Sequence, residues 1–460
     1  MNKKLYKIGF VGYALMFIMA LLFYKERTVF VDISYHLFHI LREDSFAIQN
    51  HRFGAAFTQV FPLMSGKFGL SLNTIMLIYS SCFVFYYFVC YWVAGSVLKQ
   101  YKLALVILFT NILFVTDTFY WIQSELPQGL AFMMVVFAML SSVKELNSAY
   151  LKLLLIIAGL ITVVFFHPVI FIPFLFVLLF LMVHKGMSVN KWLLIFGAVF
   201  FVVVWLVKKA YFSAEYDAGA MSNASNNIKY LFPNYFTIPS NKTFLLNCLS
   251  KYYWIPITTL GVSLLYVLRR AWLKLALFLV FVGGYLMLVN ISYAFSAAED
   301  FYIENLYLPL GIMLGMPIVF DLLPSLESRS KQLAQIAFVA ILLTGIGRIY
   351  VHHDLYATRL GWLRNYLDEH KEEKILMSSS KVPKDTLLMT WGTSYEFWLL
   401  STTERGRTAS IIICDDVEDK QWIVKYQQHF LAQWGVYPYV DLPKRYFKFE
   451  DSVSSYRVIK

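Results

Sequence analysis

The feature that most constrains this chain is a series of long apolar stretches separated by short polar ones. A helix needs about 20 apolar residues, and at least about 17, to cross a bilayer. Apolar residues make up 59% of the 460 residues and charged ones only 15%, which excludes an ordinary soluble protein. The sequence therefore predicts an all-α polytopic membrane protein with about eleven transmembrane helices. The expected spans are 7–24, 73–97, 102–118, 127–143, 150–167, 168–184, 191–208, 252–268, 272–292, 304–321 and 331–350.

The basic residues are placed in a way that indicates orientation. If the N-terminus is inside, every inner segment carries at least two cations, as the positive-inside rule requires of short cytoplasmic loops. These cations are Lys3, Lys4, Lys7, Lys99, Lys102, Lys144, Lys152, Lys185, Lys191, Arg269, Arg270, Lys274, Arg329 and Lys331. We therefore expect a multi-pass protein of the bacterial inner (plasma) membrane, with a cytoplasmic N-terminus and an uncleaved first span. Because much of the net charge of +11 serves orientation, no nucleic-acid partner is expected.

The chain divides into two expected domains. Residues 1–350 form the transmembrane domain, which has a first outer loop at 25–72 and a further outer loop at 209–251. Residues 351–460 form a small soluble α/β domain, which an odd number of spans places on the extracytoplasmic side. Strands are expected near 374–377, 386–390, 409–414, 446–449 and 456–459, and helices near 354–370 and 416–434. A turn explains Trp391-Gly392-Thr393, and the domain has no phosphate-binding glycine loop.

The first outer loop contains a segment, 30–44, with two stripes at helical spacing. One stripe is apolar, and the other carries Asp32, His36, His39 and Glu43. This pattern is typical of a helix that lies in the membrane surface, with its apolar face in lipid. The alternative is a solvated amphipathic linker whose charges face water.

Ionisable side chains near membrane depth are costly, so they are candidates for function. On the outer side they occur at four places, and we expect helix packing to bring these places together into one pocket. Each also has a structural explanation: a solvated turn, a helix end, or a charge that complements the start of the next span. The candidates are Asp32 with His36, His39, His51 and Arg52; Asp117 and Glu125; His167; and Glu299 with Asp300.

Such a pocket suits sugar transfer from a lipid-phosphate donor. A carboxylate can take the proton from an attacking hydroxyl group. An arginine can bind a phosphate through two hydrogen bonds and offset the charge that grows on a phosphate leaving group. A second carboxylate, alone or with a histidine, can hold a divalent cation on the same phosphate.

The layout resembles the GT-C superfamily of polyprenyl-phosphate-dependent glycosyltransferases, which contains the protein mannosyltransferases and the lipid A aminoarabinose transferases. The resemblance covers about 7–350 and rests on a long first outer loop with an acid soon after the first span, here Asp32. A second acid in the next outer loop, Asp117 or Glu125, and the segment Ser124–Phe132 are also similar. Asp32 has no neighbouring second acid, so the paired-acid signature common in that family is missing. This departure bears on metal dependence more than on fold.

The resemblance implies an integral membrane glycosyltransferase that transfers a hexosyl or pentosyl group on the extracytoplasmic side. Asp32 would be the general base, and Arg52 with His51 would contact the donor phosphate. Substrate or metal contacts would come from Asp117, Glu125, His36, His39, His167, Glu299 and Asp300. The expected partners are membrane lipid, a lipid-linked sugar donor and a glycan, lipid or protein acceptor. The cofactor, if one is used, would be Mg or Mn.

Three other functions fit the same composition. An envelope polysaccharide polymerase or ligase usually depends on arginines in large outer loops, but 209–251 contains no arginine. A transporter or flippase would be expected to have paired Gly/Pro breaks and charges at mid-depth in its spans. A non-catalytic scaffold would present residues 351–460 to a partner, and its outer acids would not need to converge.

Overall fold

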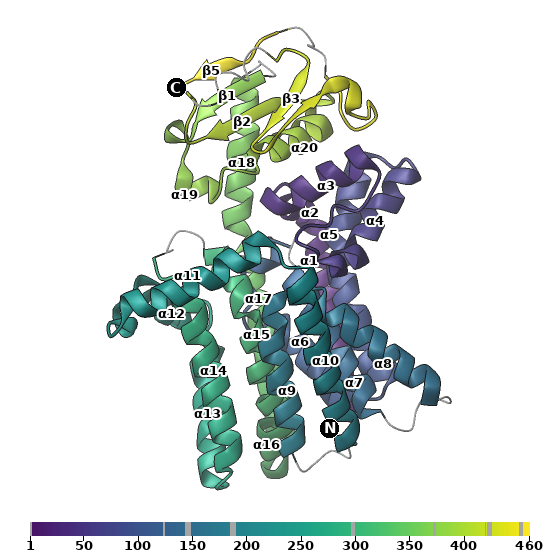
Figure 1. Cartoon of the computed structure of the whole chain (residues 1–460), viewed down its shortest axis with the longest axis vertical. Coiled ribbons are helices and arrows are strands. Elements are labelled where there is room, and N and C mark those ends of the chain that lie inside the picture. The colour runs from purple at the N-terminus through teal and green to yellow at the C-terminus, as the bar shows by residue number, and fades with distance from the viewer. Residues whose placement is uncertain are drawn as a thin grey trace.

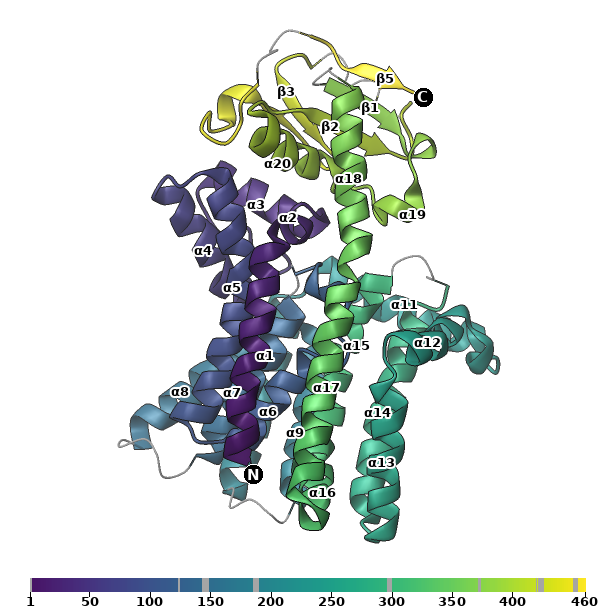
Figure 2. The same ribbon diagram turned by 180° about the vertical axis from the view of Figure 1, so that it is seen from behind.

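The computed structural model describes residues 2–122, 125–142, 149–184, 190–295, 300–370, 374–418, 420, 426–449 and 454–460. A bundle of long helices carries a small domain with strands at one end (Figure 1). The N-terminus, the turn between α13 (Trp254–Leu268) and α14 (Trp272–Ser292), and α16 (Leu323–Arg329) lie at the opposite end (Figure 2). The basic segments at Lys3, Arg269 and Arg329 therefore share one end of the bundle, and the C-terminal domain occupies the other.

The bundle agrees with the predicted membrane class. A helix covers most of each predicted span that the structure describes. These helices are α1 (Asn2–Leu22), α5 (Leu72–Trp92), α6 (Tyr101–Thr110), α7 (Glu125–Ser141), α8 (Ala149–Val164), α9 (Phe171–Val183), α10 (Lys191–Tyr211), α13 (Trp254–Leu268), α14 (Trp272–Ser292), α15 (Asp300–Pro317) and α17 (Lys331–Val351). Within the described residues, six helices are long and apolar enough to cross a membrane, and five apolar helices are shorter, at 10–17 residues. The number of spans therefore stays a prediction.

The core of the bundle lies where α6 and α15 cross. Every residue from Leu103 to Thr110 on α6 is buried, although this helix is too short to be counted as a span on its own. Gly311 on α15 permits the close approach, because a Cβ atom there would lie 3.1 Å from the Cα atom of Thr110. α15 then runs through a π-helical turn (Ile318–Leu322) into α16.

The first outer loop forms a layer between the bundle and the C-terminal domain, made of α2 (Tyr24–Thr28), α3 (Val31–Glu43), η1 (Phe53–Ala55) and α4 (Ala56–Lys67) (Figure 2). The predicted helix at 30–44 is confirmed, but its expected contact with lipid is wrong. Ile33, Leu37 and Ile40 are buried within the protein. The ring of Phe38 packs against rings of the C-terminal domain, including that of Trp398, 5.4 Å away between centroids. The solvated-linker alternative is wrong for His36, which is buried, whereas Glu43 at the end of the helix is exposed.

The outer loop expected at 209–251 forms two helices that project sideways from the bundle, α11 (Glu215–Leu231) and α12 (Pro239–Ser250), with η5 (Tyr235–Thr237) between them (Figures 1 and 2). Large side chains such as Tyr230, Phe236 and Leu249 are more than four-fifths exposed. An arm with so much exposed apolar surface suits a membrane interface better than open water.

The C-terminal domain begins with α18 (His353–Glu369), which follows α17 directly (Figure 2). Its parallel sheet has the order β2-β1-β5, with β1 (Lys374–Ser378), β2 (Ser410–Cys414) and β5 (Arg457–Ile459), so that Leu376 lies between Ile412 and Val458. The other elements are η7 (Ser379–Lys381), α19 (Lys384–Leu387), α20 (Thr393–Arg405), β3 (His429–Ala432), β4 (Gly435–Pro438) and η9 (Tyr439–Asp441).

The predictions for this domain are only partly right. The helix at 354–370 and the strands at 374–377, 409–414 and 456–459 are confirmed. The strand expected at 386–390 is wrong, because the chain there ends α19 and turns. The strand expected at 446–449 is also wrong, because the backbone N–H groups of Tyr446 and Phe447 bond to the carbonyl oxygen of Pro443 in a turn. The helix expected at 416–434 is wrong in its second half, because His429–Ala432 form strand β3 of the antiparallel pair β3–β4. Residues 419 and 421–425 of that expected helix lie outside the described residues.

Candidate functional site

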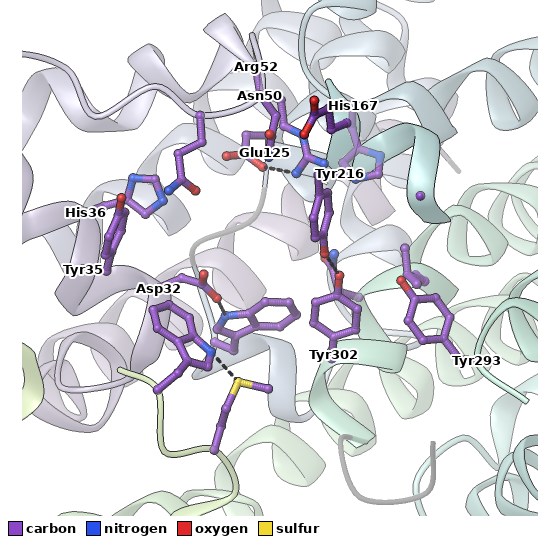
Figure 3. A pocket seen from close by; sticks show the side chains of 18 of the residues that line it. Asp32, Tyr35, His36, Asn50, Arg52, Glu125, His167, Tyr216, Tyr293 and Tyr302 are labelled. Carbon is purple, nitrogen blue, oxygen red and sulfur yellow. Dashed lines mark hydrogen bonds and ion pairs between the residues drawn. The ribbon is translucent and has the colours of Figure 1, made fainter. Parts of the chain in front are cut away.

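A cavity of about 1040 Å³ lies where the first outer loop, the bundle and the C-terminal domain meet. Figure 3 shows that side chains from distant parts of the chain point toward it. Its lining residues are Asp32, Tyr35, His36, Gln49, Asn50, Arg52, Trp121, Glu125, His167, Glu215, Tyr216, Gly219, Ser292, Tyr293, Tyr302, Asn305, Leu306, Met389, Trp391 and Trp434. The structure therefore brings together the sequence candidates Asp32, His36, Arg52, Glu125 and His167.

Asp32 stands in the first turn of α3, and its side chain is partly exposed to the cavity. The indole Nε1–H of Trp121 donates a hydrogen bond of 2.5 Å to its Oδ2 atom. Burial raises the pKa of Asp32 to about 7, against the opposing effects of the Trp121 hydrogen bond and the charge of Arg52. The negative charge of Glu125 raises it further. A carboxyl group that titrates near neutral pH is suited to exchange a proton with a substrate.

Arg52 and Glu125 form an ion pair across the cavity wall, with 3.2 Å between Nη1 and Oε2 (Figure 3). Asn50 and His51, the two residues before Arg52, both have the left-handed backbone conformation, with φ of 50° and 55°. That conformation is uncommon outside glycine, and runs of it occur where the fold enforces a sharp turn. The turn directs Arg52 inward, where its guanidinium also lies 5.8 Å from the ring centroid of Tyr216.

Two of the candidate histidines, His36 and His167, line the cavity. His36 is buried; its Nδ1 lies 2.9 Å from the carbonyl oxygen of Ala47, and burial lowers its pKa to about 3, so the ring is neutral at physiological pH. His167 lines the cavity, and its Nδ1 accepts a hydrogen bond from the backbone N–H of Val169. A neutral His36 can offer hydrogen bonds to a substrate but no charge.

His39 and His51 do not line the cavity. The Nδ1 atom of His39 lies 3.0 Å from Oε1 of Glu43, and its ring packs on Tyr35, with 4.4 Å between centroids. The ring of His51 lies 5.8 Å from that of Phe212, the residue that follows α10. The expected donor-phosphate contact from His51 is therefore not supported by its position.

Asp117 does not line the cavity either, so Glu125 holds the position of the second acid there. Asp117 is buried in an ion network, 2.9 Å from Nζ of Lys251 and 3.3 Å from Nδ1 of His352. Its backbone oxygen accepts a hydrogen bond of 2.9 Å from the amide of Trp121. Asp117 thus helps to position the residue that bonds Asp32, and it does not line the cavity itself.

Glu299 lies outside the described residues. Asp300 begins α15, but nothing about its side chain is described. The acid that this region contributes to the buried structure is Glu304, which accepts hydrogen bonds from the backbone N–H groups of Thr116 (2.7 Å) and Thr118 (2.9 Å). Glu304 was not chosen from the sequence, because the candidates in this region were Glu299 and Asp300, which stand just ahead of the expected span at 304–321.

Sequence reasoning also missed the part of the cavity wall that comes from the C-terminal domain. Met389, Trp391 and Trp434 line it, although they lie more than 300 residues from Asp32 in the chain. The sequence feature that could have indicated this wall was the Trp391-Gly392 pair, but a turn was a sufficient explanation for it. On the bundle side, Asn305 lines the cavity. Its Oδ1 atom is buried and has no hydrogen-bond partner among the described residues.

The donor set does not form a metal cage made by protein alone. Among the described residues, no three His, Cys, Asp or Glu side chains are gathered closely enough to hold an ion. Glu125 is already paired with Arg52, and Asp32 with Trp121. The positive charge that the cavity itself offers to a phosphate is the guanidinium of Arg52.

Comparison of the chain with known protein families, with characterised proteins and with solved structures finds no match. The functional argument therefore rests on the geometry of this cavity.

Proposed function

We propose that this protein is an integral membrane glycosyltransferase that moves a hexosyl or pentosyl group from a polyprenyl-phosphate donor to an acceptor hydroxyl group. The observation that carries the proposal is the meeting of Asp32, Arg52 and Glu125 in one large cavity at the end of an apolar bundle. A scaffold would not need outer acids and an arginine to converge there.

The chemistry assigns one role to each group. The acceptor oxygen attacks the anomeric carbon of the donor sugar, and Asp32 takes the proton of the hydroxyl group as the new bond forms. The bond between the anomeric carbon and the phosphate oxygen breaks, and the lipid phosphate leaves with the electron pair. Arg52 offsets the charge that develops on that phosphate, while Glu125 holds the guanidinium in place.

The surroundings of Arg52 suit a donor that arrives from the membrane. His167 lines the cavity just before η4 (Pro168–Ile170), in the short connection between α8 and α9, and Tyr216 and Phe53 stand at the starts of α11 and η1. The arm formed by α11 and α12 exposes large apolar side chains beside this part of the cavity. We place the donor's lipid tail among these elements, in a bacterial inner membrane that about eleven helices cross. The N-terminus is then cytoplasmic and residues 351–460 extracytoplasmic.

The partners in this proposal are membrane lipid, a lipid-linked sugar and a glycan, lipid or protein acceptor. Mg or Mn remains an optional addition, and no step is assigned to it. An envelope polysaccharide polymerase or ligase would use the same cavity differently, with a longer saccharide attached to the carrier phosphate.

The test uses the full chain in lipid nanodiscs with polyprenyl phosphates carrying radiolabelled hexoses or pentoses. Asp32→Asn should lower transfer by about 100- to 10,000-fold, the range for loss of a general base. Arg52→Ala should lower it by about 100- to 1,000-fold, as loss of a group that stabilises developing charge does. Asp44→Asn is the matched control, because Asp44 ends the same helix but is exposed. A fully active Asp32→Asn variant would remove the central residue and with it the proposal.

A further inference from the structure

The cavity has an aromatic corner on the side of the C-terminal domain. Trp391 and Trp434 pack together with 4.5 Å between ring centroids and 36° between planes. Tyr35 of α3 closes the corner, 6.2 Å from Trp391 and 6.0 Å from Trp434. Trp434 remains 62% exposed although it lines the cavity, so a large apolar ring face is left open to whatever enters.

The corner is held rigidly over Asp32. Glu396 on α20 accepts a hydrogen bond of 2.6 Å from the backbone N–H of Val31, and Arg359 on α18 donates one of 3.1 Å to the carbonyl oxygen of Val29. Gly392 touches the same segment, since a Cβ atom there would lie 2.5 Å from the Cα atom of Val31. The residue after Trp391 is thus in contact with the residue before Asp32.

A second anchor lies at the other side of the domain. The hydroxyl group of Tyr446 donates to the carbonyl oxygens of Gly66 (3.2 Å) and Leu70 (3.4 Å), at the connection between α4 and α5. With two anchors the domain cannot swing about one contact. The aromatic corner is therefore a preformed wall, which lowers the entropic cost of binding a ligand against it.

The two ends of the cavity differ in chemistry. Arg52 and His167 give one end positive charge and hydrogen-bond donors, which suit a phosphate. The opposite wall offers indole faces, with the amides of Gln49 and Asn50 also at the cavity. A pyranose ring has this mixed character, because its axial C–H groups form an apolar face and its hydroxyl groups project around the rim. A lipid tail would gain nothing from the amides.

We propose that Trp391 and Trp434 form a carbohydrate subsite that binds the acceptor, a glycan whose ring stacks on the indoles while its free hydroxyl group reaches Asp32. The inference rests on the proposed function and adds the acceptor class to it. In this arrangement the C-terminal domain supplies the wall that binds the acceptor, and the first outer loop and the bundle supply the base and the phosphate contact.

The experiment measures glycan binding without any donor. Labelled full-length protein in detergent is applied to a printed glycan array, and the strongest glycan is then titrated while tryptophan fluorescence is recorded. Trp391→Ala and Trp434→Ala should each weaken binding by up to about tenfold, the effect of losing one aromatic contact. Trp434→Tyr, which retains a ring, should stay within about twofold of the wild type.

Trp192→Ala is the matched control, because Trp192 is 80% exposed but lies on α10, away from the cavity. The subsite is refuted if no glycan binds the wild type above background, or if Trp192→Ala weakens binding as much as Trp434→Ala. Transfer assays separate this inference from the proposed function. Glycan binding with no transfer would contradict the proposed function alone. Transfer with an acceptor KM unchanged by Trp434→Ala would contradict the subsite alone.

Discussion

We infer that the buried ion pair between Arg359 and Glu396 holds the C-terminal domain in position beside Asp32. The two side chains are 2% and 0% exposed. Arg359 donates to Glu396, to the carbonyl oxygen of Leu387 (2.9 Å) and to that of Val29 (3.1 Å). Replacing Arg359 with Met leaves a buried carboxylate and two carbonyl groups without their donor.

Removing one partner of a buried ion pair costs about 3–5 kcal/mol, because the other charge stays buried and uncompensated. Burial already raises the pKa of Glu396 against the effect of Arg359, so without Arg359 this carboxyl group should take up a proton more readily. We expect Arg359→Met to destabilise the contact between α20 and α3 by about 3 kcal/mol or more. Arg359→Met combined with Glu396→Leu should cost less than Arg359→Met alone, since no unpaired charge remains.

Hydrogen exchange measures the destabilisation of this contact directly, because the backbone N–H of Val31 is bonded to Glu396. A loss of about 3 kcal/mol should speed exchange in a peptide covering 29–35 by about 100-fold. The control is Arg364→Met, which breaks a pair with Glu404 whose side chains are 40% and 25% exposed. Exposed pairs contribute about 0–1 kcal/mol, so exchange should change by less than about fivefold. Equal effects of the two substitutions would refute the idea that the buried pair holds this segment.

Four further predictions concern the cavity and its frame. The rate of transfer should rise with pH around a midpoint near 7, where Asp32 ionises. The folded chain holds the proton of Asp32 more tightly than the unfolded chain does, so Asp32 lowers the free energy of unfolding as pH rises from about 4 to about 7. Asp32→Asn should therefore raise Tm at pH 8 and leave it unchanged below pH 4. Gly392→Ala should displace Val31 and lower transfer, whereas Gly361→Ala, with nothing within 4 Å of the added Cβ, should leave transfer unchanged and be neutral or stabilising. Transfer should persist in EDTA, because Arg52 supplies the charge opposite the phosphate; restoration only by Mg or Mn would contradict that role.

The sequence was informative about helices because their signal is local. Apolar runs and the 3.6-residue period predicted a helix in each expected span, and they predicted α3 to within a residue or two. The span expected at 102–118 was too long, because α6 ends at Thr110. The α20 segment, Thr393–Arg405, lacked this signal, because threonine, serine, tyrosine and tryptophan are weak helix formers. All ten residues from Thr393 to Thr402 are buried, so tertiary packing decides that helix.

The candidate site was predictable only as a set of residue types. That Asp32, Arg52 and Glu125 would meet followed from the cost of ionisable groups near a membrane and from loops that share one side. The sequence could not choose between Asp117 and Glu125, since both stand in one short connection and the choice depends on Lys251 and His352, far away in the chain. Long-range pairing of this kind leaves no periodic trace in a single sequence.

The position of Asp117 also explains how the bundle and the C-terminal domain act on one carboxyl group. His352 stands at the junction of α17 and α18, and it contacts Asp117, so the helix that leads into the C-terminal domain is tied to the connection that carries Trp121. Trp121 bonds Asp32 from the bundle side, and Glu396 holds the backbone before Asp32 from the domain side. A displacement of the domain would therefore disturb Asp32 through both routes at once. This arrangement makes the C-terminal domain part of the site, and it accounts for why the domain is fastened to the bundle by buried polar contacts when an apolar surface would have been enough for attachment.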